Sequence, residues 1–448
     1  MPTNNAHKLE TEPIGKLLTS YAVPAILGML VMALYNIVDR MFIGQGVGSD
    51  AIAGLALTFP VMTITTAVGT LIGVGASTRI SIVLGMKDKV WAEKILGNSL
   101  VLTVALSAVY VTCFVLYMDE LLLLFGGSEA TIPYAHEYLM YILPGMALTN
   151  LAYSFNGMMR SSGYPTKAMW TMAMGAVINV ALDPLFIFTF DLGIKGASIA
   201  SVISMAITAA LVMHHFLTPK SYIRFRRHSF TLELRIIRNI ISIGMAPFLM
   251  NITASLVNVL LNRQLQAYGG DIAIGSFGIA NTYILLIIMI ILGLCQGMQP
   301  IVGYNYGAQR ADRVMDTYFL TATIAVFITT ISTILAQLFP EAIARCFTTD
   351  EQLIASTVNC LHKMTWVFPL VGFQIVTTNL FQSVSMAKIS IFLSLTRQVL
   401  FLIPMLMILP SMFGVNGVWH AFPASDFAAT VTSVVIIYYY RQLFTSPR

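Results

Sequence analysis

The chain has 448 residues, of which 57% are hydrophobic and only 10% are charged, and its net charge is +5. Soluble domains carry about 25% charged residues, so this composition excludes a soluble protein and predicts an all-α polytopic membrane protein. Its basic residues cluster at alternate helix junctions, which indicates membrane topology rather than a nucleic-acid partner. The four cysteines have no metal-binding spacing, and we expect no cofactor. The lipid bilayer is the predicted surrounding.

Twelve apolar stretches are long enough to cross the bilayer core, which takes about 20 helical residues. They are predicted at 17–43, 52–83, 93–118, 131–157, 168–190, 196–217, 239–267, 272–303, 315–338, 353–382, 388–409 and 417–440. An even number of spans places both termini on one side. If that side is the cytoplasm, 19 lysines and arginines fall in inner segments, 5 fall in outer segments, and Arg397 lies within a span. The positive-inside rule therefore predicts that both termini are cytoplasmic.

The second half of the chain repeats the first. Pro24 recurs as Pro247 and Gly196 recurs as Gly417, with almost no gaps between these positions. Each half has six spans in the same orientation, so we expect two lobes related by a pseudo-two-fold axis along the membrane normal. The predicted units are an N-lobe, a basic cytoplasmic linker and a C-lobe, at 1–218, 219–238 and 239–448. Parallel repeats of this kind are typical of transporters, with the substrate site between the lobes.

Three carboxylates inside the predicted spans need a specific explanation: Asp39, Asp183 and Asp426. The repeat does not preserve the first two, because Asn262 and Ile403 stand at the corresponding positions of the second half. An ionised carboxylate in a bilayer costs several kcal/mol, so it needs a partner, an ion or a functional role. Two acids in one lobe of a duplicated membrane protein indicate ion-driven transport.

Four sequence patterns resemble the multidrug and toxic compound extrusion (MATE) family over essentially the whole chain. They are Pro24 with Tyr35-Asn36-Ile37-Val38-Asp39, Gly73-Val74-Gly75 with Gly85, the turn Arg160-Ser161-Ser162-Gly163-Tyr164-Pro165-Thr166-Lys167, and Asn179 with Asp183-Pro184. Within the family the chain is similar to the DinF-like branch, and within that branch to MepA-like bacterial members. The reasons are the acids in the N-lobe and the patterns Phe381-Gln382-Ser383 and Arg397-Gln398-Val399-Leu400-Phe401-Leu402-Ile403-Pro404.

The resemblance implies a function and a set of site residues. It implies a monomeric antiporter of the bacterial cytoplasmic membrane that exports amphipathic, often cationic, organic compounds in exchange for H⁺ or Na⁺ by alternating access. The branch's cation site falls on Asp39, Asn179, Asp183 and Ser201, the last being threonine in many relatives. In the family, the helix that contains Pro24 is thought to bend. A moving hinge and a static kink are both open for this proline.

Depth along the helices independently places these residues together. Asp39 lies near the outer end of its span, and Tyr35 and Asn36 share its face at i−4 and i−3. Asp183 lies about 22 Å from the inner face, and Asn179 is one turn below it. Ser201 is about five residues into the next span, so all these residues belong to the outer half of the N-lobe. Asn156 is a further candidate for the supporting polar network.

The chemistry of this set suits a small cation. Two carboxylates, an amide carbonyl and a hydroxyl are hard oxygen ligands, and two adjacent acids without an ion would favour binding a proton. Either Na⁺ or H⁺ would therefore change the charge of the lobe. The alternative is that Asp39 pairs with Arg40 and that Asp183 is bonded locally, although adjacent residues on a helix face different ways.

Arg397 and Asp426 have a different interpretation. Counting residues places both near the middle of the membrane, on neighbouring antiparallel spans. This favours a buried structural ion pair over a coupling role.

Two other functions compete with cation-coupled export. A lipid-linked oligosaccharide flippase of the same superfamily would need a basic inter-lobe cavity, and this chain has only Arg397 at mid-membrane depth. An intramembrane enzyme would need a metal motif or a nucleophile motif, and the sequence contains neither HExxH nor GxSxG. Both rank below the antiporter.

Overall fold

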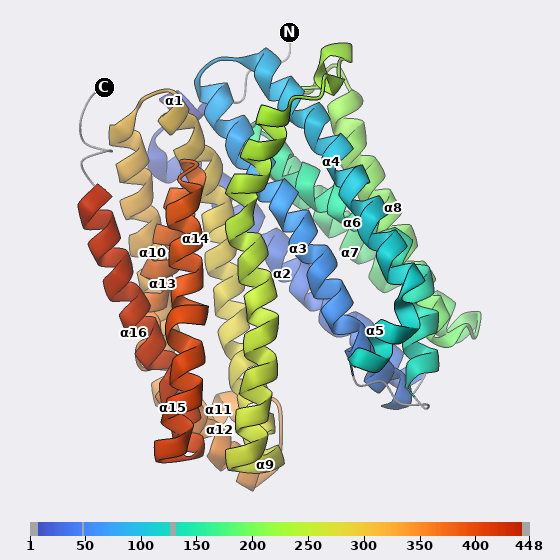
Figure 1. Cartoon of the computed structure of the whole chain (residues 1–448), viewed down its shortest axis with the longest axis vertical. Helices are drawn as coiled ribbons and strands as arrows, with labels where there is room; N and C mark the ends of the chain where they lie inside the picture. Colours follow the sequence, from blue (N-terminus) through green and yellow to red (C-terminus); the bar gives the residue numbers. More distant parts are fainter. Residues whose placement is uncertain (1–7, 47–48, 126–130, 441–448) are drawn as a thin grey trace.

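The computed structural model describes residues 8–46, 49–125 and 131–440, and these ranges are built from helices and short connections (Figure 1). The N-terminal half contains α1 (Lys8–Thr11), α2 (Ile14–Gly46), α3 (Ser49–Gly85), α4 (Lys89–Leu116), α5 (Met118–Leu124), α6 (Ile132–Ser161), α7 (Pro165–Pro184), η2 (Leu185–Thr189) and α8 (Gly193–Leu217). The C-terminal half contains η3 (Arg227–Phe230), α9 (Leu234–Gly307), α10 (Ala311–Leu338), α11 (Pro340–Arg345), α12 (Glu351–Met364), α13 (Phe368–Ser383), α14 (Ala387–Leu395), η4 (Thr396–Leu402), α15 (Ile403–Phe413) and α16 (Val415–Tyr440).

The predicted number of spans agrees with these helices. In the described ranges, nine helices are long and apolar enough to cross a membrane, and the bent pair α12–α13 adds a tenth. The 74-residue α9 comprises two spans, because Gly270 at φ 61° breaks the helix between them. The remaining span is α6, which has 30 residues but a more polar sequence. The all-α, twelve-span prediction is confirmed.

One predicted span differs in shape from the expectation. The stretch 353–382 is not a single helix, because α12 and α13 meet at a bend of 55°. Pro369 lies in the first turn of α13. A proline there has no backbone N–H to continue the preceding helix, and it restricts the residue before it, so the chain starts a new helix at this point.

Prolines also mark the two wide helical turns. The π-helical segment η2 directly follows Pro184, and the π-helical segment η4 ends at Leu402, two residues before Pro404. A proline cannot donate the hydrogen bond of a regular turn, and the helix adjusts locally by widening. Two polar residues that the sequence singles out are found at these wide turns: Asp183 lies just before η2, and Arg397 lies within η4.

The helices form two groups that meet along α3 and α9 (Figure 1). α2 to α8 make up one group, and α9 to α16 make up the other. The groups lie close together at the end that contains α1 and the end of α16, and they diverge toward the end that contains α5 and α12. We call the first the termini end; the positive-inside rule predicts that it is cytoplasmic.

Glycines explain how closely the lobes approach at the termini end. A Cβ atom on Gly244 of α9 would lie 1.8 Å from the carbonyl oxygen of Leu71 on α3. A Cβ atom on Gly307, at the other end of α9, would lie 2.0 Å from the carbonyl oxygen of Ile82. Membrane helices pack this tightly only where small residues let the backbones touch. The lobes are therefore in backbone contact at this end.

The hydrophobic core has the same asymmetry. The larger buried cluster joins both lobes and includes Ile72 and Ile80 of α3 together with Ile240 and Ile301 of α9. A second cluster contains N-lobe residues only, in the half of the lobe away from the termini. The lobes thus share a core near the termini, and the far half of the N-lobe packs on itself.

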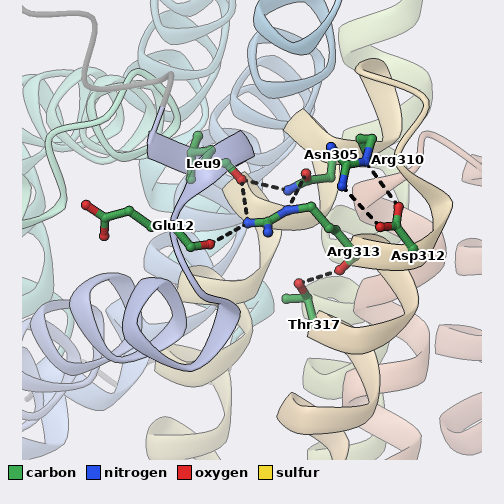
Figure 2. Close-up of polar contacts among 7 residues, drawn as sticks. All are labelled: Leu9, Glu12, Asn305, Arg310, Asp312, Arg313 and Thr317. Carbon is green, nitrogen blue, oxygen red and sulfur yellow. Dashed lines mark hydrogen bonds and ion pairs between the residues drawn. The ribbon is translucent and has the colours of Figure 1, made fainter.

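Residues 8–13 form a short N-terminal strap, which contains α1, leads into α2 and lies against the C-lobe (Figure 2). Leu9 is fully buried, and its carbonyl oxygen accepts hydrogen bonds from Asn305 Nδ2 at 3.0 Å and from an Arg313 terminal nitrogen at 3.1 Å. The same Arg313 nitrogen donates to the Glu12 carbonyl oxygen at 2.7 Å. The start of α2, an N-lobe helix, is therefore held by α9 and α10 of the C-lobe.

Candidate functional site

Two carboxyl groups meet inside the N-lobe. Asp183, at the end of α7, is fully buried, and Asp39 of α2 is the neighbouring acid that acts on it. α2 and α7 pack along each other, which brings these two positions together from distant parts of the sequence. Apart from the contact with Asp39, no described residue gives either oxygen of Asp183 a hydrogen bond.

Asn179, Ser201 and Tyr35 surround the two acids. Asn179 lies one turn before Asp183 and donates from Nδ2 to Ser201 Oγ on α8, at 3.1 Å. The amide oxygen of Asn179 is buried and has no donor among the described residues. Tyr35 is within hydrogen-bonding reach of Ser201 and close enough to both acids to interact with them electrostatically. The structure thus brings together the four residues of the predicted cation site and Tyr35, from α2, α7 and α8.

Three oxygen atoms of this cluster have no hydrogen-bond donor among the described residues. Both oxygens of Asp183 and the amide oxygen of Asn179 point into a buried region that supplies them with no donor from the described residues. A buried acceptor without a partner costs about 1–3 kcal/mol, and more when it is charged. A proton shared by the acids, or a small cation that prefers oxygen ligands, would offset that cost. The residues therefore fit a Na⁺ ion or a proton.

One predicted member of the supporting network, Asn156, stands outside this cluster. The side chain of Asn36 lies outside the described residues. Asn156 of α6 donates to the Ala168 carbonyl oxygen at 2.7 Å and to Thr171 Oγ1 at 3.0 Å. Thr171 precedes Asn179 by eight residues on α7, which is roughly 12 Å along the helix. Asn156 therefore belongs to a separate polar group nearer the termini end.

Arg160 belongs to that second group, and its burial was not predicted from the sequence. The turn motif and the positive-inside rule place it among the inner bases, but its side chain is only 8% exposed and donates to Asn156 Oδ1. The signal in the sequence is the i, i+4 spacing of Asn156 and Arg160 on one helix face. The N-lobe thus contains a buried cation as well as its two acids.

Pro24 lies within one uninterrupted helix, because α2 runs from Ile14 to Gly46 through this residue. It precedes Asp39 by 15 residues, a separation of roughly 22 Å along the helix. The residues around it pack on α9: a Cβ atom on Gly293 would lie 2.7 Å from the Ile26 Cα. Bending at Pro24 stays a prediction.

Arg397 and Asp426 are in direct contact in the C-lobe. Arg397 Nε lies 2.7 Å from Asp426 Oδ1, and the two side chains are 17% and 5% exposed. The arginine belongs to the π-helical η4 and the aspartate to α16. The charge of this mid-membrane arginine is therefore matched by a buried carboxylate. Whether the pair is purely structural stays a prediction.

Other potential sites do not overlap with the acids. A cavity of about 560 Å³ opens between α10, α11 and α12, and its lining includes Pro340, Arg345 and His362 but none of the predicted site residues. Among the residues that the structure describes, no group of three or more His, Cys, Asp or Glu side chains could hold a metal ion.

Comparison with known proteins identifies the family. The family model described as MatE matches residues 24–185 and again residues 247–408. The chain belongs to the MatE family. The double match places one copy of the family model in each half of the chain, with Pro24 and Pro247 at the corresponding starts. MatE membership confirms the resemblance drawn from the sequence, and the chain is a multi-pass membrane transporter rather than an enzyme.

Relatives and solved structures extend the similarity over the full length. The chain is 25% identical over 445 residues to the multidrug export protein MepA of Staphylococcus aureus (strain MSSA476), covering 99% of this chain and 98% of MepA. A solved MATE structure in the straight conformation is 25% identical, with a TM-score of 0.93 and 99% of each chain covered. The MATE multidrug transporter DinF-BH, solved in complex with a ligand, is 38% identical, with a TM-score of 0.91 and 97% of this chain and 98% of DinF-BH covered. These relatives match the predicted DinF-like and MepA-like character.

Proposed function

We propose that this MatE transporter exports amphipathic, often cationic, organic compounds in exchange for H⁺ or Na⁺, with coupling at Asp39 and Asp183. The observation that carries the proposal is the buried N-lobe cluster in which Asp183 meets Asp39 and its oxygens lack other partners among the described residues. The printed names of the relatives support the substrate class: MepA is a multidrug export protein, and DinF-BH is a MATE multidrug transporter.

The proposed mechanism uses the charge of the N-lobe as the switch. Without a proton or cation, the two carboxylates repel each other in a buried site; with one, the cluster is close to neutral. Such a change alters the stability of one arrangement of the lobes relative to the other, and it drives transport only if the drug and the cation prefer different arrangements. Tyr35 and Asp39 on α2 and Asn179 and Asp183 on α7 transmit the change to the helices that carry them.

The contacts at the termini end support alternation by movement of whole lobes. The backbone contacts of Gly244 and Gly307 with α3 close the lobes against each other at that end. With the termini end on the cytoplasmic side, the described arrangement is the outward-facing one. The opposite state requires the contact between α3 and α9 to open.

The decisive experiment measures efflux of a fluorescent organic cation from proteoliposomes under separately imposed Na⁺ and H⁺ gradients. We expect Asp39→Asn and Asp183→Asn to lose gradient-driven efflux and to keep their monodisperse elution. The matched control is Asp312→Asn, which removes a surface acid that pairs with Arg310 at 3.2 Å. Efflux at the wild-type rate in both N-lobe variants would sink the assignment, and the gradient that drives wild-type efflux identifies the coupling ion.

The oligosaccharide flippase is the weaker alternative. It requires a basic surface between the lobes for a pyrophosphate, but the mid-membrane base of the C-lobe, Arg397, is matched by Asp426. The same proteoliposomes test it, since a flippase would move a lipid-linked sugar without either gradient.

A further inference from the structure

Two arginines from different lobes converge on one tryptophan at the termini end. The guanidinium carbon of Arg79, on α3, lies 5.1 Å from the ring centroid of Trp91 on α4. The guanidinium carbon of Arg235, in the first turn of α9, lies 5.7 Å from the same centroid. An indole ring attracts cations, but two like charges beside one ring repel each other. The arrangement therefore needs a negative charge nearby.

The protein does not supply that charge from the residues the structure describes. Glu93, on the same helix as Trp91, is already in contact with His228 at 2.9 Å and with Arg226 at 3.4 Å. Glu233, which directly precedes α9, pairs with Lys94 at 2.6 Å. Neither Arg79 nor Arg235 takes part in an ion pair within the described ranges, and the Nε atom of Arg79 is buried without an acceptor. Both nearby acids already pair with other bases, and the second oxygen of Glu93, Oε1, is buried and accepts from neither arginine within the described ranges.

The surroundings of these arginines favour a lipid as the missing partner. Three exposed apolar side chains lie beside them in the sequence: Leu232 at 59%, Leu234 at 80% and Val90 at 54% exposure. Arg79 is six residues from the end of α3, roughly 9 Å along the helix, which is the depth of a headgroup region. The first turn of a long helix such as α9 also offers free backbone N–H groups to an anion. Apolar surface around a basic pocket matches acyl chains around a phosphate.

We propose that Arg79, Arg235 and Trp91 form a binding site for the headgroup phosphate of an anionic phospholipid of the cytoplasmic leaflet. The phosphate would lie between the two guanidinium groups and relieve their repulsion, while the acyl chains run along the apolar side chains. Basic pockets between membrane helices on the cytoplasmic side commonly bind such headgroups. Because the arginines belong to different lobes, the lipid bridges the lobes at the end where they touch. This site is independent of the coupling chemistry of the acids.

The test counts lipids bound to the purified protein. The protein in detergent is titrated with phosphatidylglycerol or with phosphatidylcholine, and bound lipid is measured by native mass spectrometry. We expect Arg235→Gln and Arg79→Gln each to weaken phosphatidylglycerol binding about fivefold, the equivalent of about 1 kcal/mol per basic side chain near an anionic lipid. Phosphatidylcholine binding is expected to be the same in all variants. Arg235 is exposed, so we expect Arg235→Gln to fold even if the substitution of the half-buried Arg79 destabilises the protein.

The matched control is Arg227→Gln. Arg227 is an exposed base of η3 that is not among the described contacts of Trp91. Because both substitutions remove one arginine, Arg227→Gln has the same net charge as Arg235→Gln. Phosphatidylglycerol binding at the wild-type level in this control supports the site. An equal loss in Arg227→Gln and Arg235→Gln would show diffuse attraction by charge and overturn it. Inorganic phosphate that competes with the lipid at equal concentration would also overturn it, since the site would then take free phosphate.

Discussion

At the scale of single residues, the site depends on oxygen atoms that the fold leaves without donors. The oxygens of Asp183 and the amide oxygen of Asn179 are buried, while the Asn179 amide nitrogen is oriented by Ser201. We propose that Ser201 is a positioning residue, because its hydroxyl accepts from the Asn179 amide nitrogen and so orients that amide. Threonine, which is expected in relatives, would supply the same hydroxyl.

The role of Ser201 can be measured directly. We expect Ser201→Ala to raise the cation concentration for half-maximal efflux about threefold to tenfold, as the loss of one hydrogen bond of about 0.5–1.5 kcal/mol predicts. Ser201→Thr keeps the hydroxyl and should behave as the wild type. Efflux from proteoliposomes at graded Na⁺ or H⁺ gradients gives the constant, and equal effects of the two variants would contradict the role of the hydroxyl.

The ion pair of the C-lobe makes a separate prediction about stability. Asp426→Asn leaves the buried Arg397 charge without its partner, so we expect a loss of about 3–5 kcal/mol in unfolding free energy. The double variant Arg397→Met with Asp426→Leu removes both charges and should lose much less. Denaturant or thermal unfolding in detergent gives the comparison. A single variant of unchanged stability but altered gradient dependence would instead assign the pair to coupling.

At the scale of elements, the N-terminal strap fixes the start of α2. Arg313 makes three hydrogen bonds there: to the carbonyl oxygens of Leu9 and Glu12 and to Asn305 Oδ1 at 3.0 Å (Figure 2). α2 also carries Asp39 near its other end. The strap therefore ties the helix that carries one of the two acids to the opposite lobe.

Loss of the strap contacts should loosen this end of α2 alone. We expect Arg313→Gln to speed amide hydrogen exchange at residues 8–16 about tenfold to hundredfold, since hydrogen bonds to a charged group contribute about 1.5–3 kcal/mol. The control Arg345→Gln removes an exposed base that pairs with Glu341 and Glu351, at the end of the C-lobe away from the termini, and should leave exchange at residues 8–16 unchanged. Hydrogen exchange followed by mass spectrometry gives the comparison; equal exchange in both variants would show that the strap is held by Leu9 burial instead.

At the scale of the whole molecule, the arrangement of the lobes rests on backbone contacts between α3 and α9. Gly244→Ala would place a methyl group 1.8 Å from the Leu71 carbonyl oxygen, so the helices must separate. We expect a loss of about 1–3 kcal/mol in the stability of the described arrangement, as overpacking generally causes. Gly278→Ala is the control, because a Cβ atom there meets nothing within 4 Å. Thermal unfolding reports the stability, and a pair of spin labels across the termini end reports whether the lobes open. Equal behaviour of the two variants would exclude a role for the close contact.

The sequence by itself determined the class, the twelve spans and the duplication. Hydropathy and length depend on local physics, because an apolar stretch must satisfy its backbone hydrogen bonds as a helix in a membrane. The cost of buried charge likewise pointed to Asp39, Asp183 and the Arg397–Asp426 pair before any contact was known. Depth counted along helices placed Asn179 and Ser201 at the right level because the helical rise is constant.

Only the tertiary structure decided which polar side chains meet. Depth alone sets Asn156 apart from the cluster of acids, but it could not show that this residue bonds to Arg160 and to the first turns of α7. Nor could it show that Arg160 turns inward, that the strap is held by Arg313, or that Arg79 and Arg235 share Trp91. These outcomes depend on the rotation of each helix about its axis and on contacts between different helices. The sequence of one helix specifies neither the rotation of that helix in the bundle nor the residues of other helices that it contacts.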